Sequence, residues 1–218
     1  MTEIFSPLVE RAIETAAEWH DGTFRKGRWT PPCVVPPEGE AVRVPAMAHV
    51  TAVALTVQRA GWGDEAVAAA FLHDALEDVN RYRQRLAREA RVEVVGEAVV
   101  RIVEAVSEPK QGPDGRPLPW RPRKEAYLEG LAAGPVEAVA VSLADKLHNA
   151  YAMASSLAAG VDVFTPAPGR QALSAGPADQ AWFFHAVLAL SERERDPRLT
   201  PMRRRLRAEV ERFEALAA

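Results

Sequence analysis

Four ionisable side chains lie within the apolar stretch FLHDALEDV at residues 71–79, namely His73, Asp74, Glu77 and Asp78. On an α-helix, which turns by about 100° per residue, these side chains share a stripe less than half of the circumference wide. The flanking alanine, leucine and phenylalanine residues indicate a buried helix, and a buried carboxylate without a partner is strongly unfavourable. The stripe therefore either faces water or lies against a cation.

Two other apolar stretches carry polar groups of the same types. The segment SLADKLHNA at residues 142–150 has Asp145 and Asn149 four residues apart, on one helix face. The segment PAMAHVTAVAL at residues 45–55 carries one isolated imidazole. If the three helices meet, two imidazoles and two carboxylates face one point, and their two negative charges match a divalent cation. The candidate metal ligands are His49, His73, Asp74 and Asp145.

Each of these signals has a simpler explanation when it is taken alone. A single histidine is more often a hydrogen-bonded core residue than a ligand, which applies to His49 and still more to His20 and His185. An acidic stripe such as residues 77–79 is usually a solvated helix face. An adjacent His-Asp pair within an apolar helix is harder to explain in this way. The combination of the three segments therefore carries the metal hypothesis.

The composition restricts the class of protein. With 218 residues, 48% of them hydrophobic, the chain is typical of a globular protein, and we expect one domain over residues 1–218 with a core at about 8–190. A net charge of −3 gives no general attraction to a polyanion, so we expect no nucleic-acid partner. We also expect no membrane segment and no secretory signal, hence a cytoplasmic location. The single cysteine, Cys33, excludes an internal disulfide.

The alanine-rich sequence predicts an all-α fold. Ser6 and Pro7 are suited to cap a first helix that ends near His20. Thr200 is the expected cap of the last helix, which packs on the core. The helices after the first are expected at about 46–60, 64–79, 80–91, 93–107, 121–133, 135–158, 178–193 and 200–217.

Three stretches interrupt the helical pattern. Residues 27–45 contain five prolines and two short valine-rich pieces, which predicts a small β-hairpin. Residues 108–122 predict a long surface loop, and loops of that length in compact domains are often functional. Residues 159–178 form a third irregular segment.

The order of these motifs resembles that of the HD-domain metal-dependent phosphohydrolases. It is most similar to the hydrolase half of the RelA/SpoT proteins and to the free-standing small alarmone hydrolases, where RKG, PY..H, LLHD..ED and LADRLHN follow one another. The corresponding segments are RKG at 25–27, VPAMAH at 44–49, FLHDALED at 71–78 and SLADKLHN at 142–149. PWRPRKEAYLEGL and DQAWFFHAVL also resemble the free-standing branch. The resemblance covers about residues 8 to 190.

This resemblance implies an enzyme that uses a divalent metal, Mn²⁺ above all, to remove the 3′-diphosphate from guanosine tetra- or pentaphosphate. The products are pyrophosphate and GDP or GTP. It implies that the four candidate ligands hold the metal and that Glu77 and Asp78 lie around the attacking water, whose proton they accept. It also places Arg25, Lys26 and Asn149 around the nucleotide.

Other cations and one aromatic side chain are further candidates for substrate binding. The transition state of phosphoryl transfer carries negative charge, which Lys124 or Lys146 would stabilise. After Asn149 the family commonly has Arg and then Thr or Ala, whereas Tyr151 and Ala152 follow here. Tyr151 either stacks on a base or packs against the protein.

Two alternatives to a guanosine tetraphosphate hydrolase stay open. The same chemistry could act on another nucleotide, such as adenosine 3′-diphosphate or a 2′- or 3′-phosphorylated cofactor. The chain could instead be a non-catalytic alarmone-binding module. We expect a small-molecule nucleotide partner, a monomer or homodimer, and no synthetase activity. The insert between Lys26 and His49 is longer than in the family.

Overall fold

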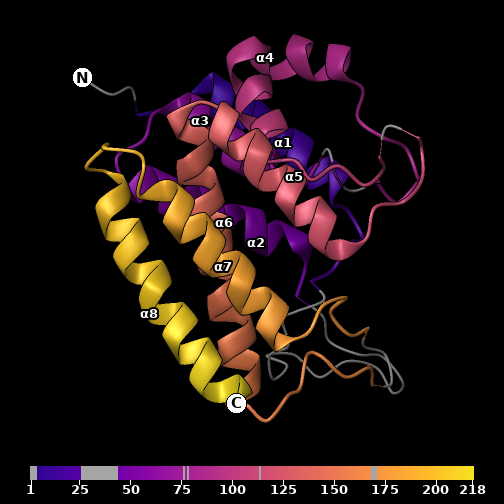
Figure 1. Cartoon of the computed structure of the whole chain (residues 1–218). Helices are drawn as coiled ribbons and strands as arrows, with labels where there is room; N and C mark the ends of the chain where they lie inside the picture. Colours follow the sequence, from indigo (N-terminus) through magenta and orange to yellow (C-terminus); the bar gives the residue numbers. More distant parts are fainter. Residues whose placement is uncertain (1–3, 26–43, 76, 78, 113, 168–170) are drawn as a thin grey trace.

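The computed structural model describes residues 4–25, 44–75, 77, 79–112, 114–167 and 171–218 (Figure 1). Within these ranges the chain forms eight α-helices and no β-strand, which confirms the predicted all-α fold. The helices are α1 (Pro7–Trp19), α2 (Ala46–Arg59), α3 (Asp64–Leu72), α4 (Arg88–Ala105), α5 (Trp120–Ala133), α6 (Val136–Ala158), α7 (Pro177–Ser191) and α8 (Leu199–Ala217). Among them, none combines the length and apolar character that crossing a membrane requires.

Most helix predictions agree with the structure to within one or two residues at each end. The expected cap of the last helix is wrong, because Thr200 lies inside α8 and the N-cap is Arg198. Asp196 Oδ1 accepts the backbone N–H of Arg198 at 2.9 Å and so forms the turn that starts the helix earlier.

The predicted helices at 64–79 and 80–91 are wrong, because α3 ends at Leu72 and α4 begins only at Arg88. Asn80 accounts for part of this difference. Its side-chain oxygen accepts the backbone N–H groups of Tyr82 at 3.0 Å and Gln84 at 2.9 Å. Such side-chain-to-backbone hydrogen bonds offer the chain an alternative to a helix.

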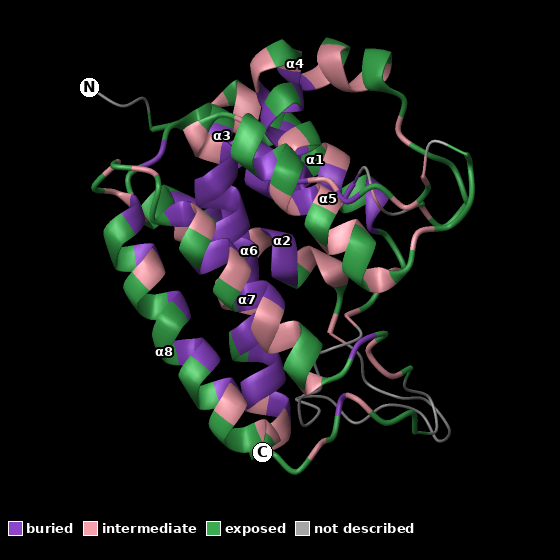
Figure 2. Ribbon diagram, in the orientation of Figure 1, coloured by how far each residue is buried: buried purple, intermediate pink, exposed green. Residues whose placement is uncertain are grey.

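Helix α6 runs through the middle of the bundle, with α7 and α8 on one side (Figure 1). It contacts α2, α3, α4, α7 and α8, and 14 of its 23 residues are buried. Figure 2 shows this burial along most of its visible length. A helix that is surrounded in this way presents apolar side chains on nearly every face, so Asp145 and Lys146 are exceptions that need partners.

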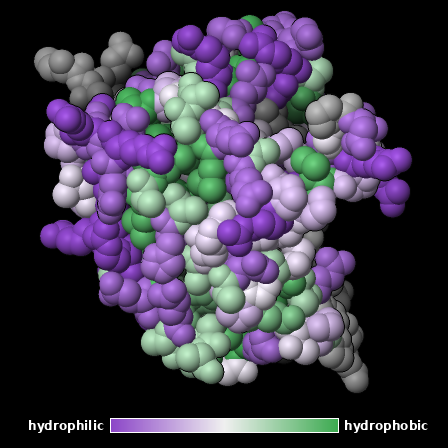
Figure 3. All heavy atoms as spheres, in the orientation of Figure 1, coloured by the Kyte–Doolittle hydropathy of each residue, from purple (hydrophilic) through white to green (hydrophobic). Residues whose placement is uncertain are grey.

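Helix α8 is amphipathic, in contrast to α6. Its buried side chains include Leu206, Val210 and Phe213, while hydrophilic side chains gather along its outer side and over α4 (Figure 3). The apolar side of this helix lies toward α6, which α8 contacts.

Two of the irregular segments expected from the sequence lie in connections between helices. The expected loop at 108–122 lies between α4 and α5, where Gly112 N–H donates to the Arg116 carbonyl at 2.9 Å. The expected hairpin at 27–45 lies almost entirely outside the described residues. Its base is described: Arg25 N–H donates to the Val44 carbonyl at 2.8 Å. This bond places Arg25 next to the start of α2.

Gly134 lies at the end of α5, where this helix approaches α4. A Cβ added there would lie 2.5 Å from the Cβ of Ala105, closer than two non-bonded carbon atoms approach each other. We expect Gly134→Ala to lower the free energy of unfolding by about 1–3 kcal/mol, the usual cost of overpacking. A urea titration followed by circular dichroism measures this change.

Gly130, one turn earlier in α5, is the matched control. Its added Cβ would lie 3.8 Å from the Ala105 carbonyl oxygen, an ordinary contact. Because alanine is favoured over glycine inside a helix by about 1 kcal/mol, Gly130→Ala should leave stability unchanged or raise it. Equal destabilisation by both substitutions would contradict the proposed clash.

Candidate metal centre

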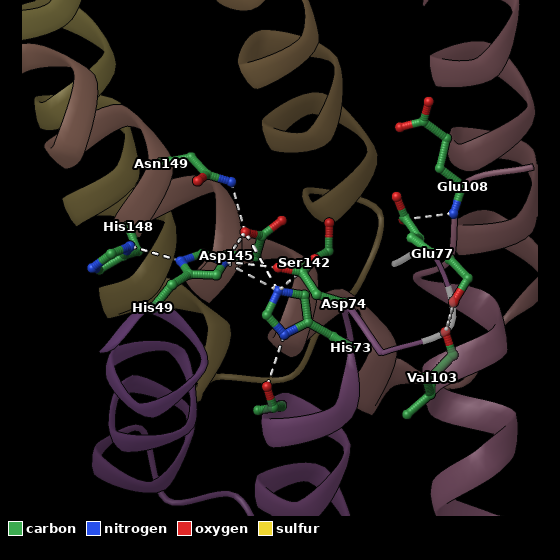
Figure 4. Close-up of polar contacts among 12 residues, drawn as sticks. His49, His73, Asp74, Glu77, Val103, Glu108, Ser142, Asp145, His148 and Asn149 are labelled. Atoms are coloured by element: carbon green, nitrogen blue, oxygen red, sulfur yellow. Dashed lines mark hydrogen bonds and ion pairs between the residues drawn. The ribbon is translucent and has the colours of Figure 1, made fainter. Parts of the chain in front are cut away.

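The side chains of His49, His73 and Asp145 meet although they come from three separate elements (Figure 4). His49 lies in the first turn of α2, His73 follows directly after α3, and Asp145 lies in the middle of α6. The His49 Nε2 atom lies 3.2 Å from His73 Nε2 and 3.0 Å from Asp145 Oδ1. Asp74 adds Oδ1 at 3.3 Å from His73 Nε2 and Oδ2 at 3.6 Å from His49 Nε2. Two imidazoles and two carboxylates thus surround one point.

The spacing of these atoms fits a metal ion. Nitrogen and oxygen ligands lie roughly 2.0–2.2 Å from a bound ion such as zinc, so neighbouring ligand atoms are separated by roughly 2.8–3.6 Å. The distances from the two histidines to each other and to the two aspartates, from 3.0 to 3.6 Å, fall in this range. The donor set of imidazole and carboxylate suits several divalent ions and does not choose among them.

Without a metal, cationic groups in and next to the cluster offset the negative charges of its two carboxylates. Burial, together with Arg25, lowers the pKa of His49 to about 3, so this ring is neutral. Burial also favours neutral His73, but the facing carboxylates of Asp74 and Asp145 outweigh it and raise the pKa of His73 to about 9. Although burial disfavours its charged form, Lys146 holds the pKa of Asp145 well below its ordinary value. Both carboxylates are therefore ionised at neutral pH.

A second layer of contacts holds these side chains in place. The His73 Nδ1 atom donates to the Ala70 carbonyl at 2.8 Å, and His49 Nδ1 lies 2.8 Å from His148 Nδ1. Asn149 Nδ2 donates to Asp145 Oδ1 at 2.6 Å.

Lys146 and Arg25 extend this layer of contacts. Lys146 forms an ion pair with the other oxygen of Asp145, and Arg25 donates to the side-chain oxygen of Asn149. The chain Arg25–Asn149–Asp145 thus links the base of the insert to the cluster.

The cluster opens into two adjoining cavities of about 210 Å³ and 330 Å³. The inner cavity reaches His49, His73 and Asp145, and the outer one does not. Side chains that line both cavities include Arg25, Asp74, Glu77, Lys124 and Asn149. A ligand in the outer cavity can therefore extend one end toward the cluster.

Glu77 lies on a different side of the cleft from the two histidines (Figure 4). Its Oε1 accepts the backbone N–H of Glu108 at 2.7 Å, and its Oε2 lies 3.1 Å from Lys110 Nζ. Burial raises the pKa of Glu77, because its charged form is removed from water. The connection between α4 and α5 thus fixes the orientation of this carboxylate.

Two ammonium groups lie over the same aromatic ring. Lys124 Nζ is 4.7 Å and Lys146 Nζ 5.0 Å from the centre of the Phe183 ring. Lys124 also pairs with Glu108, whose other oxygen lies 2.9 Å from Arg123 Nη1. Burial and the neighbouring Lys146 lower the pKa of Lys124. This wall of the cleft is suited to a negatively charged ligand.

A family model for the HD domain matches residues 37–165, more than half of the chain. The chain belongs to the HD-domain family. This match includes the three histidine and aspartate segments that form the cluster. The HD phosphohydrolase family predicted from the order of the motifs is thereby confirmed.

Individual relatives of this HD-domain protein support the same assignment. A curated relative is the guanosine-3′,5′-bis(diphosphate) 3′-pyrophosphohydrolase of Haemophilus influenzae, 30% identical over 146 residues. That match covers 64% of this chain but 18% of the relative, so the chain spans less than a fifth of the relative's length.

Two solved structures share the fold of this HD-domain protein. The crystal structure of lmo0812 from Listeria monocytogenes EGD-e is 26% identical, with a TM-score of 0.60 over 75% of this chain and 91% of that one. A metazoan ortholog of SpoT, described as hydrolysing ppGpp, is 19% identical, with a TM-score of 0.60 over 98% and 97% of the two chains. At that identity the second likeness concerns the fold alone.

The predicted substrate residues of the HD-domain protein differ in whether they line the two cavities. Arg25, Lys124 and Asn149 line both cavities and Lys146 lines the inner one, whereas Tyr151 lines neither. The Tyr151 side chain is exposed, and its ring lies 6.0 Å from the guanidinium carbon of Arg212 in α8. Lys26 and Asp78 lie outside the described residues, so their proposed roles stay predictions.

Residues that sequence reasoning missed include Lys110, which contacts Glu77, and two others that touch the candidate site. His148 contacts His49, and Glu108 contacts Glu77 and Lys124. A signal for His148 was present, because it lies three residues after Asp145 and therefore on the same helix face. Glu108 gave no such signal, since it lies in a loop.

Metal binding by the HD-domain protein should release about one proton per ion around neutral pH, because His73 must lose its proton to ligate. His49 is already neutral, and both aspartates are already ionised. The apparent affinity should therefore rise about tenfold per pH unit up to the pKa of His73, about 9.

Calorimetric titration with Mn²⁺ in buffers of different ionisation enthalpy measures the released proton. The heat of binding should vary with the buffer. The same heat in every buffer would show that His73 is neutral before the metal arrives.

Proposed function

We propose that this HD-domain protein hydrolyses the 3′-diphosphate of guanosine tetra- and pentaphosphate with the help of Mn²⁺. The convergence of His49, His73, Asp74 and Asp145 beside a cleft with a cationic wall carries this proposal. The name of the Haemophilus influenzae relative supports the choice of substrate. The products are pyrophosphate and GDP or GTP.

The four converging side chains would hold the metal. Their donor set and spacing fit a divalent ion, as described above. When bound, such an ion supplies a Lewis acid that polarises phosphoryl oxygen and lowers the pKa of a coordinated water. Asn149 donates to Asp145 Oδ1, the oxygen that faces His49, and Lys146 pairs with Oδ2, so both oxygens of this carboxylate are held in place.

Glu77 is the proposed proton acceptor, with Asp78 beside it in sequence. The attacking water must lose a proton while its oxygen bonds to the phosphorus next to the 3′ oxygen. The bond from that phosphorus to the 3′ oxygen then breaks, and the 3′ oxygen takes up a proton. The raised pKa of Glu77 suits this role, because a general base works best when its pKa approaches the working pH.

The cations of the cleft would stabilise the phosphoryl groups. Arg25 offers a planar guanidinium, which can bind phosphate through two hydrogen bonds, and Lys124 and Lys146 offer point charges. Each of the two lysines is paired with a carboxylate in the structure, which holds its ammonium group at the cleft. A preorganised charge of this kind stabilises the transition state without reorganisation. Lys26 is proposed to act with Arg25.

A related nucleotide is the second candidate substrate. Tyr151 and Ala152 stand where the family commonly has a basic residue, and Tyr151 lies outside both cavities. The contact that would favour guanine is therefore not assigned to a described side chain. The same chemistry on adenosine 3′-diphosphate or a phosphorylated cofactor remains the alternative.

Product analysis on a small nucleotide panel with Mn²⁺ tests the proposed function. We expect pyrophosphate and GDP from guanosine tetraphosphate, and little turnover of the adenosine counterpart. Release of orthophosphate, or faster turnover of the adenosine nucleotide, would contradict the assigned substrate. Asp74→Ala is the control, because loss of this carboxylate should abolish Mn²⁺ binding and turnover together.

Glu77→Gln should separate metal binding from catalysis. The amide cannot accept a proton from water, so we expect kcat to fall by about 10²-fold or more with Mn²⁺ binding retained. Glu104→Gln is the matched control, since Glu104 pairs with Arg88 on the surface of α4 and should keep the wild-type rate. Loss of Mn²⁺ in Glu77→Gln would reassign this residue to the metal ligands.

A further inference from the structure

We propose that His148 is a positioning residue for His49. In this arrangement the His148 Nδ1 atom accepts a hydrogen bond from His49 Nδ1–H and so keeps the opposite nitrogen of His49 free to bind the metal. The inference rests on the metal site of the proposed function.

The two nitrogens of His49 have different surroundings. Its Nε2 atom faces the cluster, 3.2 Å from His73 Nε2 and 3.0 Å from Asp145 Oδ1. Its Nδ1 atom faces the other way and lies 2.8 Å from His148 Nδ1 (Figure 4). The two rings are tilted by 52° with their centres 4.8 Å apart, so they meet through nitrogen atoms rather than by stacking.

One proton must lie between the two Nδ1 atoms, because 2.8 Å is a hydrogen-bond distance. A neutral imidazole carries a proton on one nitrogen and a lone pair on the other. A metal bound at His49 Nε2 needs the lone pair there, which places the His49 proton on Nδ1. His148 must then accept, and its own proton lies on Nε2.

His73 is held in a different way. Its Nδ1 atom faces the Ala70 carbonyl, an oxygen that only accepts. The tautomer of His73 is therefore fixed by the backbone, whatever side chains surround it. The tautomer of His49 depends on His148, a side chain that itself has two tautomers. Of the two proposed imidazole ligands, His49 is the one whose Nδ1 partner is a side chain that a substitution can remove.

The burial of His49 makes this dependence strong. The side chain is 1% exposed, so a Nδ1–H group without a protein acceptor would be costly. If His148 could not accept, the proton would move to Nε2, where Asp145 Oδ1 is ready to receive it at 3.0 Å. The metal would then have to displace that proton. Loss of such an orienting partner typically weakens metal binding by about 10–100-fold.

The test compares His148→Leu with His148→Asn. Leucine removes the acceptor, whereas the asparagine Oδ1 atom lies close to the place of histidine Nδ1 and restores it. The dissociation constant for Mn²⁺ is measured from the electron paramagnetic resonance signal of the free ion. We expect His148→Leu to bind Mn²⁺ about 10–100-fold more weakly and His148→Asn to bind within about threefold of the wild type.

The tautomers themselves give a second readout. Long-range ¹H–¹⁵N spectra of the wild-type protein loaded with Cd²⁺ distinguish protonated from unprotonated imidazole nitrogens. An unprotonated His148 Nδ1 supports the inference, and a protonated one overturns it. This measurement decides the matter even where His148→Leu fails to fold.

The failure of this inference is distinguishable from that of the proposed function. If the wild-type protein binds no Mn²⁺, no Cd²⁺ and no other divalent ion, the metal site and this inference are both overturned. If the wild type binds Mn²⁺ and His148→Leu binds it equally well, the role of His148 alone is overturned. The same holds if His148→Asn binds as weakly as His148→Leu.

Discussion

Two carboxylates inside a helical bundle constrain the rest of this structure. Asp145 is buried and Asp74 is half-buried, and both face the same two histidines. A carboxylate that is removed from water needs a positive partner. Without a metal, the protonated ring of His73 and the ammonium group of Lys146 supply that charge. A divalent ion supplies it in the proposed enzyme. Because one side of the cluster is already satisfied by fixed groups, the side chains are held in place before the metal arrives.

Opposite charges are also paired along the cleft. Three lysines of the cleft each contact a carboxylate. Lys110 pairs with Glu77, Lys124 with Glu108, and Lys146 with Asp145. These pairs hold the ammonium groups in a partly dry cleft, where an unpaired cation would be disfavoured. Glu108 has two cationic partners, Arg123 and Lys124, so that part of the wall keeps an excess of positive charge. A polyphosphate is the kind of ligand that such a wall favours.

Local patterns in the sequence were sufficient to predict the four residues of the cluster. Polar groups stood out against apolar helices at His49, His73 and Asp145, and the combination of these three segments carried the prediction. His148 and Glu108 were missed because their roles depend on contacts across the fold. In the sequence, His148 is separated from its partner His49 by 99 positions. Glu108, whose N–H binds Glu77, is separated from it by 31 positions. Periodicity within one helix contains no information on such pairs.

The fold was predicted well where helices are apolar and poorly where polar side chains compete for the backbone. The clearest error, the helix expected over 64–79, bears directly on the site. In a helix continued past Leu72, the Ala70 carbonyl would accept the N–H of Asp74, four residues later.

Because α3 ends at Leu72, its last carbonyl groups lack partners within the helix. The Ala70 carbonyl accepts from His73 Nδ1 at 2.8 Å instead. This bond leaves His73 Nε2 to face the cluster, so the early end of α3 supplies the acceptor that orients a proposed metal ligand. The position at which α3 ends therefore matters to the chemistry of the site as much as the ligands do.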